Sequence, residues 1–412
     1  MAPPKKNAQP AAAKNTDDNS LSSVDNFVND LVKDLNKEHG ERIAYNLGTD
    51  MSPTHVERWI STGSRQLDYI ISNKRNGGVP EGRIIEIFAA PSTGKSHIAI
   101  LIARATQRMG GVAVYIDTEN ATSPENLSLL GVNVRQRFAF VETGCTEEVF
   151  KVMESTIMKF RALDKNVPLT IIWDSVAATS PKSELEGDYD KDTIGLQARV
   201  LSKGLRKITQ IIGNKNVTLI LLNQTRTKVG VMYGDPTTTP GGMAIPFMAS
   251  VRIKITGGSH IEVGEGNDKR VIGINVTAKT VKNKVANPFR ACDFQIHFGR
   301  GIFEHEEIFD VVRNYSDKNL VISGGKRVKV EGTGAWKTFT IADNDTGEVL
   351  LEKKFNKKEF GELLENPQYK LFLDDLIEQA YTIKTGDAFV PDFDENSYVE
   401  AEAVAIEKVT TE

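Results

Sequence analysis

The hydrophobic pattern in the middle of the chain alternates between two periods. Short runs made almost entirely of aliphatic residues occupy residues 82–90, 111–119, 167–178 and 217–224. Between them lie longer segments with helical periodicity, at residues 95–110, 146–163 and 194–213. Runs without polar alternation are typical of strands that are buried on both faces. Strands that alternate with helices predict an α/β fold around a mostly parallel sheet.

Two other patterns lie outside this repeat. Residues 249–256 and 271–279 alternate between polar and apolar positions, which predicts strands added antiparallel at one side of the sheet. Near the N-terminus, a narrow apolar stripe predicts a helix over residues 21–39 that ends near Gly40. Its members are Leu21, Val24, Phe27, Val28, Leu31, Val32 and Leu35. This stripe is buried either within its own local fold or against a neighbouring subunit.

The remaining segments suggest where the domains begin and end. Residues 224–246 are rich in Gly, Thr and Pro and have no period, and structureless loops of this length are usually functional or disordered. A smaller mixed segment follows, with Trp336 and a helix-like pattern over residues 357–381. The expected regions are a disordered arm (1–20), a helix and linker (21–56), the core (57–301), a small C-terminal domain (302–386) and an acidic tail (387–412).

Composition narrows the class of protein. Of the 412 residues, 26% are charged and 40% hydrophobic, which is typical of a soluble globular protein. We expect neither a membrane-spanning segment nor a secretion signal, because no apolar run has the required length or position. Cys145 and Cys292 fit no metal-binding spacing and suggest a reducing cytoplasm. The net charge of −4 argues against a wholly basic nucleic-acid coat but permits local basic patches.

The stretch APSTGKSH has the context of a phosphate-binding loop, because it follows a predicted buried strand and opens a predicted helix. The candidate ATP contacts are Ala90, Pro91, Ser92, Thr93, Gly94, Lys95, Ser96 and His97. Backbone N–H groups near Gly94 would surround phosphates at the helix N-terminus. Lys95 would contact the outer phosphates, and the Ser96 hydroxyl would be a ligand of Mg²⁺.

Ala89 stands where the usual pattern of such a loop has its first glycine. If the backbone φ angle at this position is negative, the extra methyl group costs little. If φ is positive, the cost is roughly 1 kcal/mol or more. In neither case does the alanine remove a catalytic group.

Three carboxylates come at or directly after predicted strand ends, where ligands of parallel sheets bind. Asp117 and Glu119 follow the second strand, and either could polarise an attacking water; spacing alone does not separate them. Asp174 closes the apolar run LTIIWD, which is the form of a Walker-B strand that delivers one carboxylate beside Mg²⁺.

A basic row follows on the predicted helix 194–213. Arg199, Lys203 and Arg206 lie at i, i+4 and i+7, on one face of the helix, where they could follow a phosphate backbone. The preceding acidic stretch, residues 183–193, superficially fits a calcium-binding loop. That interpretation fails because Thr193 stands where a glycine is needed and Arg199 where a bidentate glutamate is needed.

Eight motifs in this order resemble the bacterial RecA recombinase family. They are STGSRQLD, EGRIIEI, PSTGKS, YIDTEN, DSVAATSPKSELEGD, LNQTRTKVGVMYGDPTTTPGG, FMASVR and VKNKVANPF. The resemblance covers about residues 57–310 and is looser at the N-terminal helix and around Trp336. It implies a RecA-like P-loop ATPase core with an N-terminal polymerisation helix and a small C-terminal α+β domain. It also implies a DNA-dependent ATPase that forms filaments on single-stranded DNA and pairs it with a homologous duplex, with ATP and Mg²⁺ as cofactors.

The resemblance assigns roles within the nucleotide site. The family's catalytic glutamate falls on Glu119 rather than Asp117, and its Walker-B aspartate falls on Asp174. Its γ-phosphate-sensing glutamine falls on Gln224, at the start of the long loop. Lys282 and Lys284 would reach the ATP of the adjacent subunit, and Phe247 would lie at the subunit interface.

The resemblance also assigns the DNA contacts. The first DNA loop falls on residues 183–193, and Arg199 and Arg206 would contact DNA. In the second DNA loop, Arg226 and Lys228 would meet phosphates, and Gly241 and Gly242 would let the backbone approach closely. Single-strand-binding and loader proteins are the implied partners, in the cytoplasm of a bacterium or of a phage's host.

Departures from the family pattern suggest a divergent member, of a kind carried by phages. Besides Ala89, Asn126 stands where the family has an aromatic residue against the adenine, and extra residues occur around 339–356. Two rival functions stay open. A hexameric helicase-like motor would share Lys95, Glu119 and Asp174, and a non-hydrolysing DNA-binding or mediator protein would bind DNA without ATP turnover.

Overall fold

The structure is a computed structural model. It describes residues 18–40, 42–47, 55–164, 166–188, 195–213, 216–227, 237–316, 321–322 and 324–383. The chain divides into two compact units, Met1–Glu57 and Arg58–Glu412. The predicted N-terminal arm and acidic tail lie almost entirely outside the described residues.

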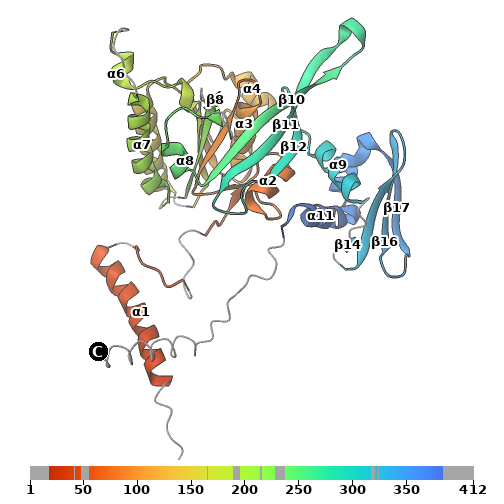
Figure 1. Cartoon of the computed structure of the whole chain (residues 1–412), viewed down its shortest axis with the longest axis horizontal. Helices are drawn as coiled ribbons and strands as arrows, with labels where there is room; N and C mark the ends of the chain where they lie inside the picture. The colour runs from red at the N-terminus through yellow and green to blue at the C-terminus, as the bar shows by residue number, and fades with distance from the viewer. Residues whose placement is uncertain are drawn as a thin grey trace, which may run out of the picture. The chain divides into compact units, whose positions relative to one another are not determined.

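A nine-stranded sheet forms the centre of the larger unit, in the order β13-β12-β11-β10-β3-β7-β6-β4-β5 (Figure 1). In chain order its strands are β3 (Ile84–Ala89), β4 (Val112–Asp117), β5 (Phe138–Glu142), β6 (Leu169–Asp174), β7 (Val217–Gln224), β10 (Val251–Val263), β11 (Arg270–Asn283), β12 (Ala291–His297) and β13 (Gly301–Ile302). Strands β3, β7, β6, β4 and β5 are mutually parallel. The predicted α/β fold with a mostly parallel sheet is therefore confirmed.

The strand direction predicted for residues 249–256 was wrong. Strand β10 pairs parallel with β3, not antiparallel as expected, and only β11, β12 and β13 continue antiparallel from it. Its first residues alternate between buried and half-buried, and its later residues are mostly exposed where the β10–β11 hairpin continues past the sheet into solvent (Figure 1). Polarity alternation reports burial and does not report strand direction.

Strand β5 had no counterpart among the predicted strands. It is short and lies at the sheet edge, and its residues are half-buried or exposed rather than uniformly apolar. Edge strands lack the continuous hydrophobic run that made the central strands recognisable.

Helices cover both faces of the sheet. One face packs against α2 (Arg65–Ser72) and α3 (Lys95–Arg108), and the other against α5 (Thr146–Leu163) and α7 (Leu196–Gly213). Alternate residues of β7 serve the two layers: Ile220 faces the α2–α3 side and Leu221 the α5–α7 side. This double burial explains the uninterrupted aliphatic runs.

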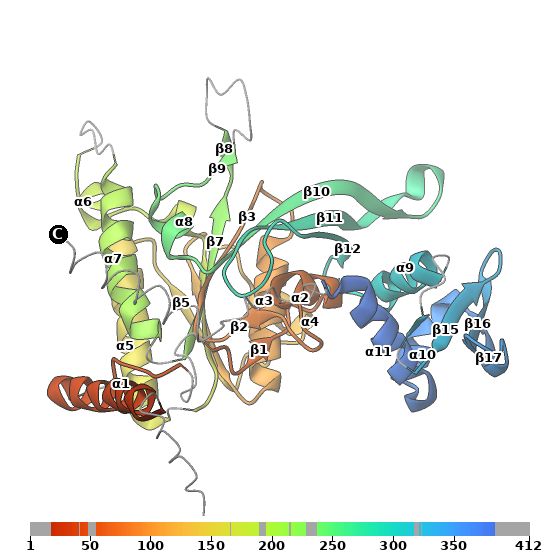
Figure 2. The same ribbon diagram turned by 60° about the horizontal axis from the view of Figure 1, so that its bottom comes forward.

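Short elements connect these layers. They are β1 (Trp59–Ile60), β2 (Val79–Pro80), α4 (Pro124–Leu129), α6 (Lys182–Leu185), β8 (Arg226–Thr227), β9 (Thr237–Thr238) and α8 (Ala244–Met248), with 3-10 turns at Val176–Ala178, Gly266–Asp268 and Lys357–Glu359. Strands β8 and β9 form a two-stranded ribbon that leaves the sheet beside α8 (Figure 2).

The C-terminal part has its own hydrophobic cluster. It contains an antiparallel sheet, β14 (Val321–Ile322), β15 (Lys326–Glu331), β16 (Trp336–Asp343) and β17 (Val349–Asn356), with helices α9 (Glu304–Ser316), α10 (Phe360–Glu365) and α11 (Pro367–Tyr381). The single helix predicted over residues 357–381 was wrong, because Asn366 caps a new helix that begins with Pro367. Proline is favoured in the first helical turn and disfavours helical backbone in the residue before it.

Buried and charged contacts join this part to the core. The Ser64 hydroxyl donates to Glu307 Oε1 at 2.5 Å. Arg65 contacts Glu304 at 2.5 Å and Asp374 at 2.7 Å. These contacts connect α2 with α9 and α11. We call this region the joint between the core and the C-terminal part; polar side chains from both parts hold it together.

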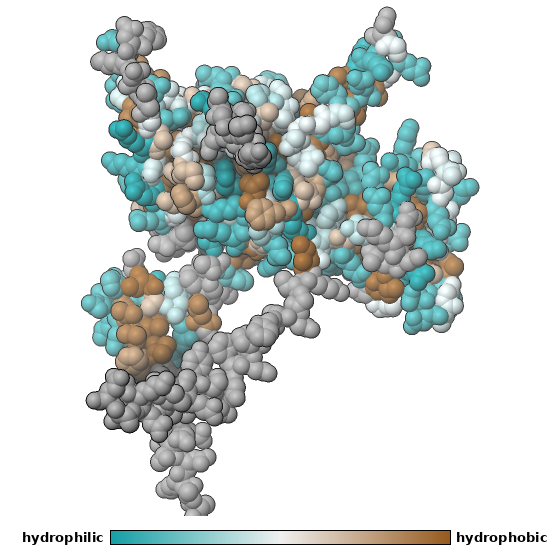
Figure 3. All heavy atoms as spheres, viewed as in Figure 1, coloured by the Kyte–Doolittle hydropathy of each residue, from teal (hydrophilic) through white to brown (hydrophobic). Residues whose placement is uncertain are grey.

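The smaller unit contains α1 (Asp18–His39), at the position predicted for an amphipathic helix. Residues after the helix fold back on it, since Asn36 Oδ1 accepts from the backbone N–H of Ile43 and of Ala44. Phe27, Val28 and Leu31 nevertheless remain 64%, 41% and 43% exposed, and Figure 3 shows hydrophobic residues gathered along this helix. The local fold thus leaves much of the stripe uncovered.

Among the described residues, the structure contains no helix that has both the length and the apolar character needed to cross a membrane.

Candidate functional site

The phosphate-binding loop connects β3 to α3 in a conformation that depends on specific residues. Gly94 precedes the helix with φ of 90°, and Ser92 also has a positive φ of 60°. The positive φ favours glycine at this position, and a Cβ there would lie 2.3 Å from Cδ1 of Ile296, whose side chain would have to shift. The Thr93 hydroxyl donates to the carbonyl of Ala90 at 2.8 Å and braces the loop from within.

Ala89 does not occupy a position that requires glycine. It is the last residue of β3, is fully buried between Gln224 of β7 and Ile255 of β10, and is not among the residues with positive φ. The negative-φ alternative therefore holds, in which the methyl group costs little.

Lys95 is 92% buried at the start of α3, with an exposed fraction of 8%. Its ammonium donates to the carbonyl oxygens of Ala90 at 3.0 Å and Ala89 at 3.4 Å. Burial lowers the pKa of Lys95, while the carboxylates of Asp174 and Glu119 act in the opposite direction. Among the described residues this buried cation is held by backbone carbonyls and lies near two carboxylates, which suits it to meet an anionic ligand.

Asp174 lies at the end of β6, opposite Asp117 in the parallel register. The buried Tyr115 hydroxyl donates to Asp174 Oδ2 at 2.5 Å. Burial raises the pKa of Asp174, whereas hydrogen bonds from Tyr115 and Ser96 lower it. The carboxylate is thus oriented by two hydroxyl groups and lies beside the predicted Mg²⁺ ligand Ser96.

The structure separates the two carboxylates that spacing could not. Asp117 is 1% exposed and accepts hydrogen bonds from the backbone N–H groups of Glu119, Ala121 and Thr122, so it shapes the turn after β4. Glu119 extends into the cavity and accepts a short hydrogen bond from the Ser175 hydroxyl. Both residues line the cavity, but of the two only Glu119 has a carboxylate that is not held by the backbone N–H groups of the turn.

Gln224 meets Glu119 across the site. Its side-chain Nε2 donates to Glu119 Oε1 at 3.2 Å, although the two residues are 105 positions apart. Gln224 ends β7 directly before the β8–β9 ribbon, so the start of the long loop touches the candidate catalytic carboxylate.

These residues line one cavity of about 410 Å³. Besides the loop, its wall includes Glu119, Asp174, Gln224, Asn126 and Phe298. Phe298, 47% exposed and 6.2 Å from the His97 ring, was not predicted from the sequence. It follows β12, about 200 residues after the phosphate loop, and no local motif marks it.

The basic row predicted on one helix face lies on α7 and is solvent-exposed. Arg199, Lys203 and Arg206 are all exposed, and the Arg206 guanidinium donates to the carbonyl of Ser202 at 3.2 Å. Arg226 is exposed on β8. Lys228 lies outside the described residues, as does the second half of the first predicted DNA loop.

Gly241 and Gly242 have positive φ angles, 94° and 69°. A Cβ at Gly241 would lie 2.8 Å from Leu201 Cδ1, and one at Gly242 would lie 3.2 Å from Ala198 Cβ. The backbone at the two glycines does approach another element closely, and within the structure that element is α7. The glycines bring the end of the long loop against the helix that carries the basic row.

The two candidate lysines of the VKNKVANPF motif do not line the nucleotide cavity of their own chain. Lys282 donates to the carbonyls of Pro246 and Phe247, at 2.6 and 2.9 Å, and burial and nearby Lys284 lower its pKa. Lys284 is exposed one residue after β11 ends at Asn283, and the Phe247 side chain is 68% exposed. Phe247, Lys282 and Lys284 thus form one surface of their own.

Comparison with known proteins decides the family. The model of the RecA N-terminal domain matches residues 26–303. The chain belongs to the RecA family. It is 36% identical to Protein RecA of Thermus aquaticus over 356 residues, which cover 86% of this chain and 95% of that protein. It is 34% identical to Protein RecA of Staphylococcus aureus (strain JH9) over 371 residues, covering 90% and 95% of the two chains.

Membership of the RecA family supports a function in DNA recombination and repair, with binding of ATP and DNA. The residues of the cavity fit the family's cofactor. Lys95 is a buried cation without a carboxylate ion pair among the described residues, and Ser96 and Asp174 offer oxygen donors side by side. No cluster of three or more His, Cys, Asp or Glu residues that could hold a metal occurs in the described chain.

Proposed function

We propose that this RecA-family protein is a DNA-dependent ATPase that forms helical filaments on single-stranded DNA and catalyses homologous pairing and strand exchange. The observation that carries the proposal is the hydrogen bond from Gln224 to Glu119. It connects the residue that begins the long loop with the carboxylate best placed for hydrolysis. A signal can therefore pass in either direction between the nucleotide and DNA sites.

Hydrolysis would follow from residues of one cavity. The phosphate loop and Lys95 hold the phosphates, and Ser96 and Asp174 hold Mg²⁺, which neutralises charge on the outer phosphates. Glu119 orients and polarises the attacking water, with Ser175 fixing one carboxylate oxygen. Asn126 and Phe298 both line the cavity, and Asn126 has no ring. Phe298 would therefore supply the aromatic surface for the adenine base of ATP.

The C-terminal end of the long loop, at Pro240, is connected to the nucleotide site through Asn223, the residue before Gln224. Asn223 is fully buried and donates to Glu86 Oε1 at 3.1 Å and to the carbonyl of Pro240 at 3.2 Å. Pro240 directly precedes the glycine pair that packs on α7. Adjacent residues of β7 thus contact the nucleotide site and the end of the DNA loop. Ordering of the loop by the γ-phosphate is the expected switch.

DNA would bind along α7 and the β8–β9 ribbon. Arg199, Arg206, Arg226 and Lys228 would contact phosphates, and Gly241 and Gly242 would set the position of the loop. Because these contacts are electrostatic and exposed, binding should weaken with added salt.

Filament formation would place residues of one subunit at the site of the next. Lys282 and Lys284 would act in trans on the ATP of the neighbour, and Phe247 would pack at that interface. The exposed stripe of α1 would dock on an adjacent subunit. A nucleotide bound at such a boundary couples hydrolysis to the packing of the filament.

The test is ATP hydrolysis with and without single-stranded DNA, on the wild type and on Glu119→Gln. We expect strong stimulation by DNA and a loss of at least about a hundredfold in the variant, with DNA binding retained. DNA binding without ATP turnover in the wild type would instead identify a mediator protein. Closed rings in electron micrographs, in place of helical filaments, would identify a helicase-like motor.

A further inference from the structure

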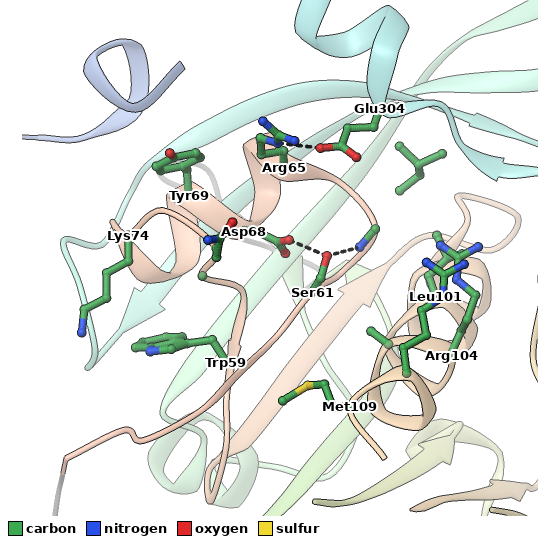
Figure 4. Close-up of a pocket in the computed structure, with 16 residues that line it drawn as sticks. Trp59, Ser61, Arg65, Asp68, Tyr69, Lys74, Leu101, Arg104, Met109 and Glu304 are labelled. Carbon is green, nitrogen blue, oxygen red and sulfur yellow. Dashed lines mark hydrogen bonds and ion pairs between the residues drawn. The ribbon is translucent and has the colours of Figure 1, made fainter. Parts of the chain in front are cut away.

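A second pocket lies between α2 and α3, at the opposite end of α3 from the phosphate loop (Figure 4). We call it the α2–α3 pocket. Its wall comes from β1, α2 and the segment after it, the C-terminal half of α3, and the start of α9; the residues used below are Trp59, Arg65, Asp68, Lys74, Arg104 and Arg108. It shares no lining residue with the nucleotide cavity. Its volume, about 410 Å³, is the same as that of the nucleotide cavity.

Three cations of the pocket have no carboxylate partner among the described residues: Lys74, Arg104 and Arg108. Lys74 instead lies 5.3 Å from the ring centre of Trp59. Arg104 and Arg108 are four positions apart on α3, so they lie on one helix face. Like charges at this spacing destabilise a helix by about 0.2–0.5 kcal/mol. An anion between them would remove that repulsion.

Arg104 is the innermost of the three. One guanidinium nitrogen donates to the carbonyl of Leu130 at 3.2 Å, which orients the group. Its Nε is buried and has no hydrogen-bond partner among the described residues. Burial lowers the pKa of Arg104, and the neighbouring Arg108 lowers it further. A buried unpaired donor carries a desolvation cost that a ligand oxygen would offset.

The acidic residues of the pocket do not supply the missing partner. Glu304 is bound to Arg65 at 2.5 Å. Asp68 accepts hydrogen bonds from the Ser61 hydroxyl at 2.6 Å and from Thr62 at 2.7 Å, and burial raises its pKa to about 7. The carboxyl groups are therefore occupied or partly neutral, and the pocket keeps an excess of positive charge.

Apolar side chains also line the pocket, together with the polar residues Ser61 and Asn76. Figure 4 shows Trp59 and Met109 along one side of the pocket and Leu101 next to Arg104 on another, and Ile302 also lines it. Binding pockets of this volume commonly combine apolar walls with a few converging polar groups. An indole ring on one side of a pocket and guanidinium groups without a carboxylate partner on another match a ligand that has a flat ring and an oxyanion.

We propose that the α2–α3 pocket binds a small phosphate-bearing ligand with an aromatic group, of the size of a nucleoside monophosphate. The phosphate lies between Arg104 and Arg108, and the ring lies along Trp59. This site is additional to the nucleotide site at the phosphate loop, and its occupation does not depend on the proposed ATPase function.

The test uses the full chain carrying Lys95→Ala, which weakens the phosphate loop, and Trp336→Phe, which removes the exposed tryptophan. Trp173 is fully buried, so Trp59 then reports the pocket through its fluorescence. The titrants are AMP, inorganic phosphate and adenosine. We expect AMP to quench Trp59 with saturation, phosphate to compete with AMP, and adenosine to bind at least about tenfold more weakly than AMP.

Substitution of the arginines decides the outcome. Arg104→Gln with Arg108→Gln should weaken AMP binding by at least about tenfold. Arg108→Gln alone, at an exposed position that cannot compromise folding, should weaken it in the same direction. Arg135→Gln, an exposed arginine outside the pocket, is the matched control and should change nothing. Absence of saturable quenching, or AMP binding that persists in both arginine variants, would overturn the proposal.

Discussion

At the scale of single residues, the nucleotide site combines groups whose roles follow from burial and from what each already binds. Asp117 and Glu119 are chemically alike, but three backbone N–H groups occupy the first, and a single hydroxyl and one amide hold the second. Lys95 is buried against carbonyls, and Asp174 is oriented by Tyr115. The partners of Asp117 and Lys95 are within six residues in the chain, whereas those of Glu119 and Asp174 are more than 50 residues away.

Restoring the missing glycine should not improve the enzyme. In Ala89→Gly, we expect ATP hydrolysis within about twofold of wild type, because the backbone at this position already has an ordinary strand conformation. Stability should fall by about 0.5–1 kcal/mol, since glycine loses more conformational entropy in a strand. Calorimetry and steady-state kinetics would measure both effects. A large gain in activity would mean that the alanine does strain the loop.

Removal of the ring beside the cavity should weaken nucleotide binding. Phe298→Ala is expected to raise the Kd for ATP by roughly tenfold, because stacking on a base contributes about 1–3 kcal/mol. Fluorescent nucleotide titration would measure it. Phe289→Ala is the matched control, since that ring is 69% exposed and does not line the cavity. Equal effects of the two substitutions would count against a role for Phe298 in base binding.

At the scale of elements, strands and helices meet at three places that matter for function or stability: the nucleotide site, the contact of the long loop with α7, and the joint between α2 and α9. The carboxyl ends of β3, β4, β6 and β7 bring the phosphate loop, Glu119, Asp174 and Gln224 together at one edge, as parallel strands do. The glycines after β9 bring the long loop against α7. The joint between α2 and α9 rests on a carboxyl group, Glu307, that is buried against Ser64.

The joint between α2 and α9 should make stability depend on pH. Burial raises the pKa of Glu307 from 4.5 to about 8, with nearby Glu304 and Asp68 acting in the same direction and Ser64 opposing them. Between these pH values the folded state keeps a proton that the unfolded state has lost. Stability therefore falls as pH rises from about 4.5 to about 8. One pKa unit corresponds to about 1.4 kcal/mol.

Glu307→Gln would test this dependence. We expect the variant to be more stable than wild type at pH 8 and to lose at least about 1 kcal/mol of the pH dependence between pH 5 and pH 8. Denaturant unfolding at both pH values would measure it. Glu306→Gln, at a neighbouring exposed position of α9, should leave the dependence unchanged. Parallel pH profiles for wild type and Glu307→Gln would show that Glu307 ionises normally.

At the scale of the whole molecule, the chain is a RecA-family protein whose activity is expected to depend on assembly. The smaller unit exposes Phe27, Val28 and Leu31 on α1, and the larger unit exposes Phe247 and Lys284. Surfaces of this kind are typical of subunit interfaces. The domain boundaries predicted at residues 57 and 301 remain proposals, as does the polymerisation role of the helix.

A charge on the α1 stripe should abolish assembly without unfolding the larger unit. For Leu31→Asp we expect loss of filaments on single-stranded DNA in electron micrographs, and a loss of DNA-stimulated ATP hydrolysis of at least tenfold. The main thermal transition should remain unchanged, because α1 belongs to a separate compact unit. Lys33→Ala on the same helix is the control. Filaments of normal length with Leu31→Asp would exclude this helix from the interface.

The sequence by itself determined the features that are local and repetitive. Aliphatic runs on the central strands, the GKS segment at the start of α3 and the aspartate that ends β6 each occupy a few consecutive residues, so their pattern predicted both the sheet and the nucleotide site. The family motifs added the choice of Glu119. The prediction of the sheet is confirmed, because burial of a strand on both faces imposes a strict local requirement on its sequence. The roles of the phosphate loop and of Glu119 stay predictions, based on phosphate binding at a helix N-terminus and on the family motifs.

Only the tertiary structure decided the direction of β10, the conformation at Ala89, the contact of Gln224 with Glu119, and the presence of Phe298 in the cavity. It alone brought Trp59, Arg104 and Arg108 into one pocket. Each of these depends on which strands and helices become neighbours. That choice is made by the burial of the whole core, and no short segment of the chain contains it.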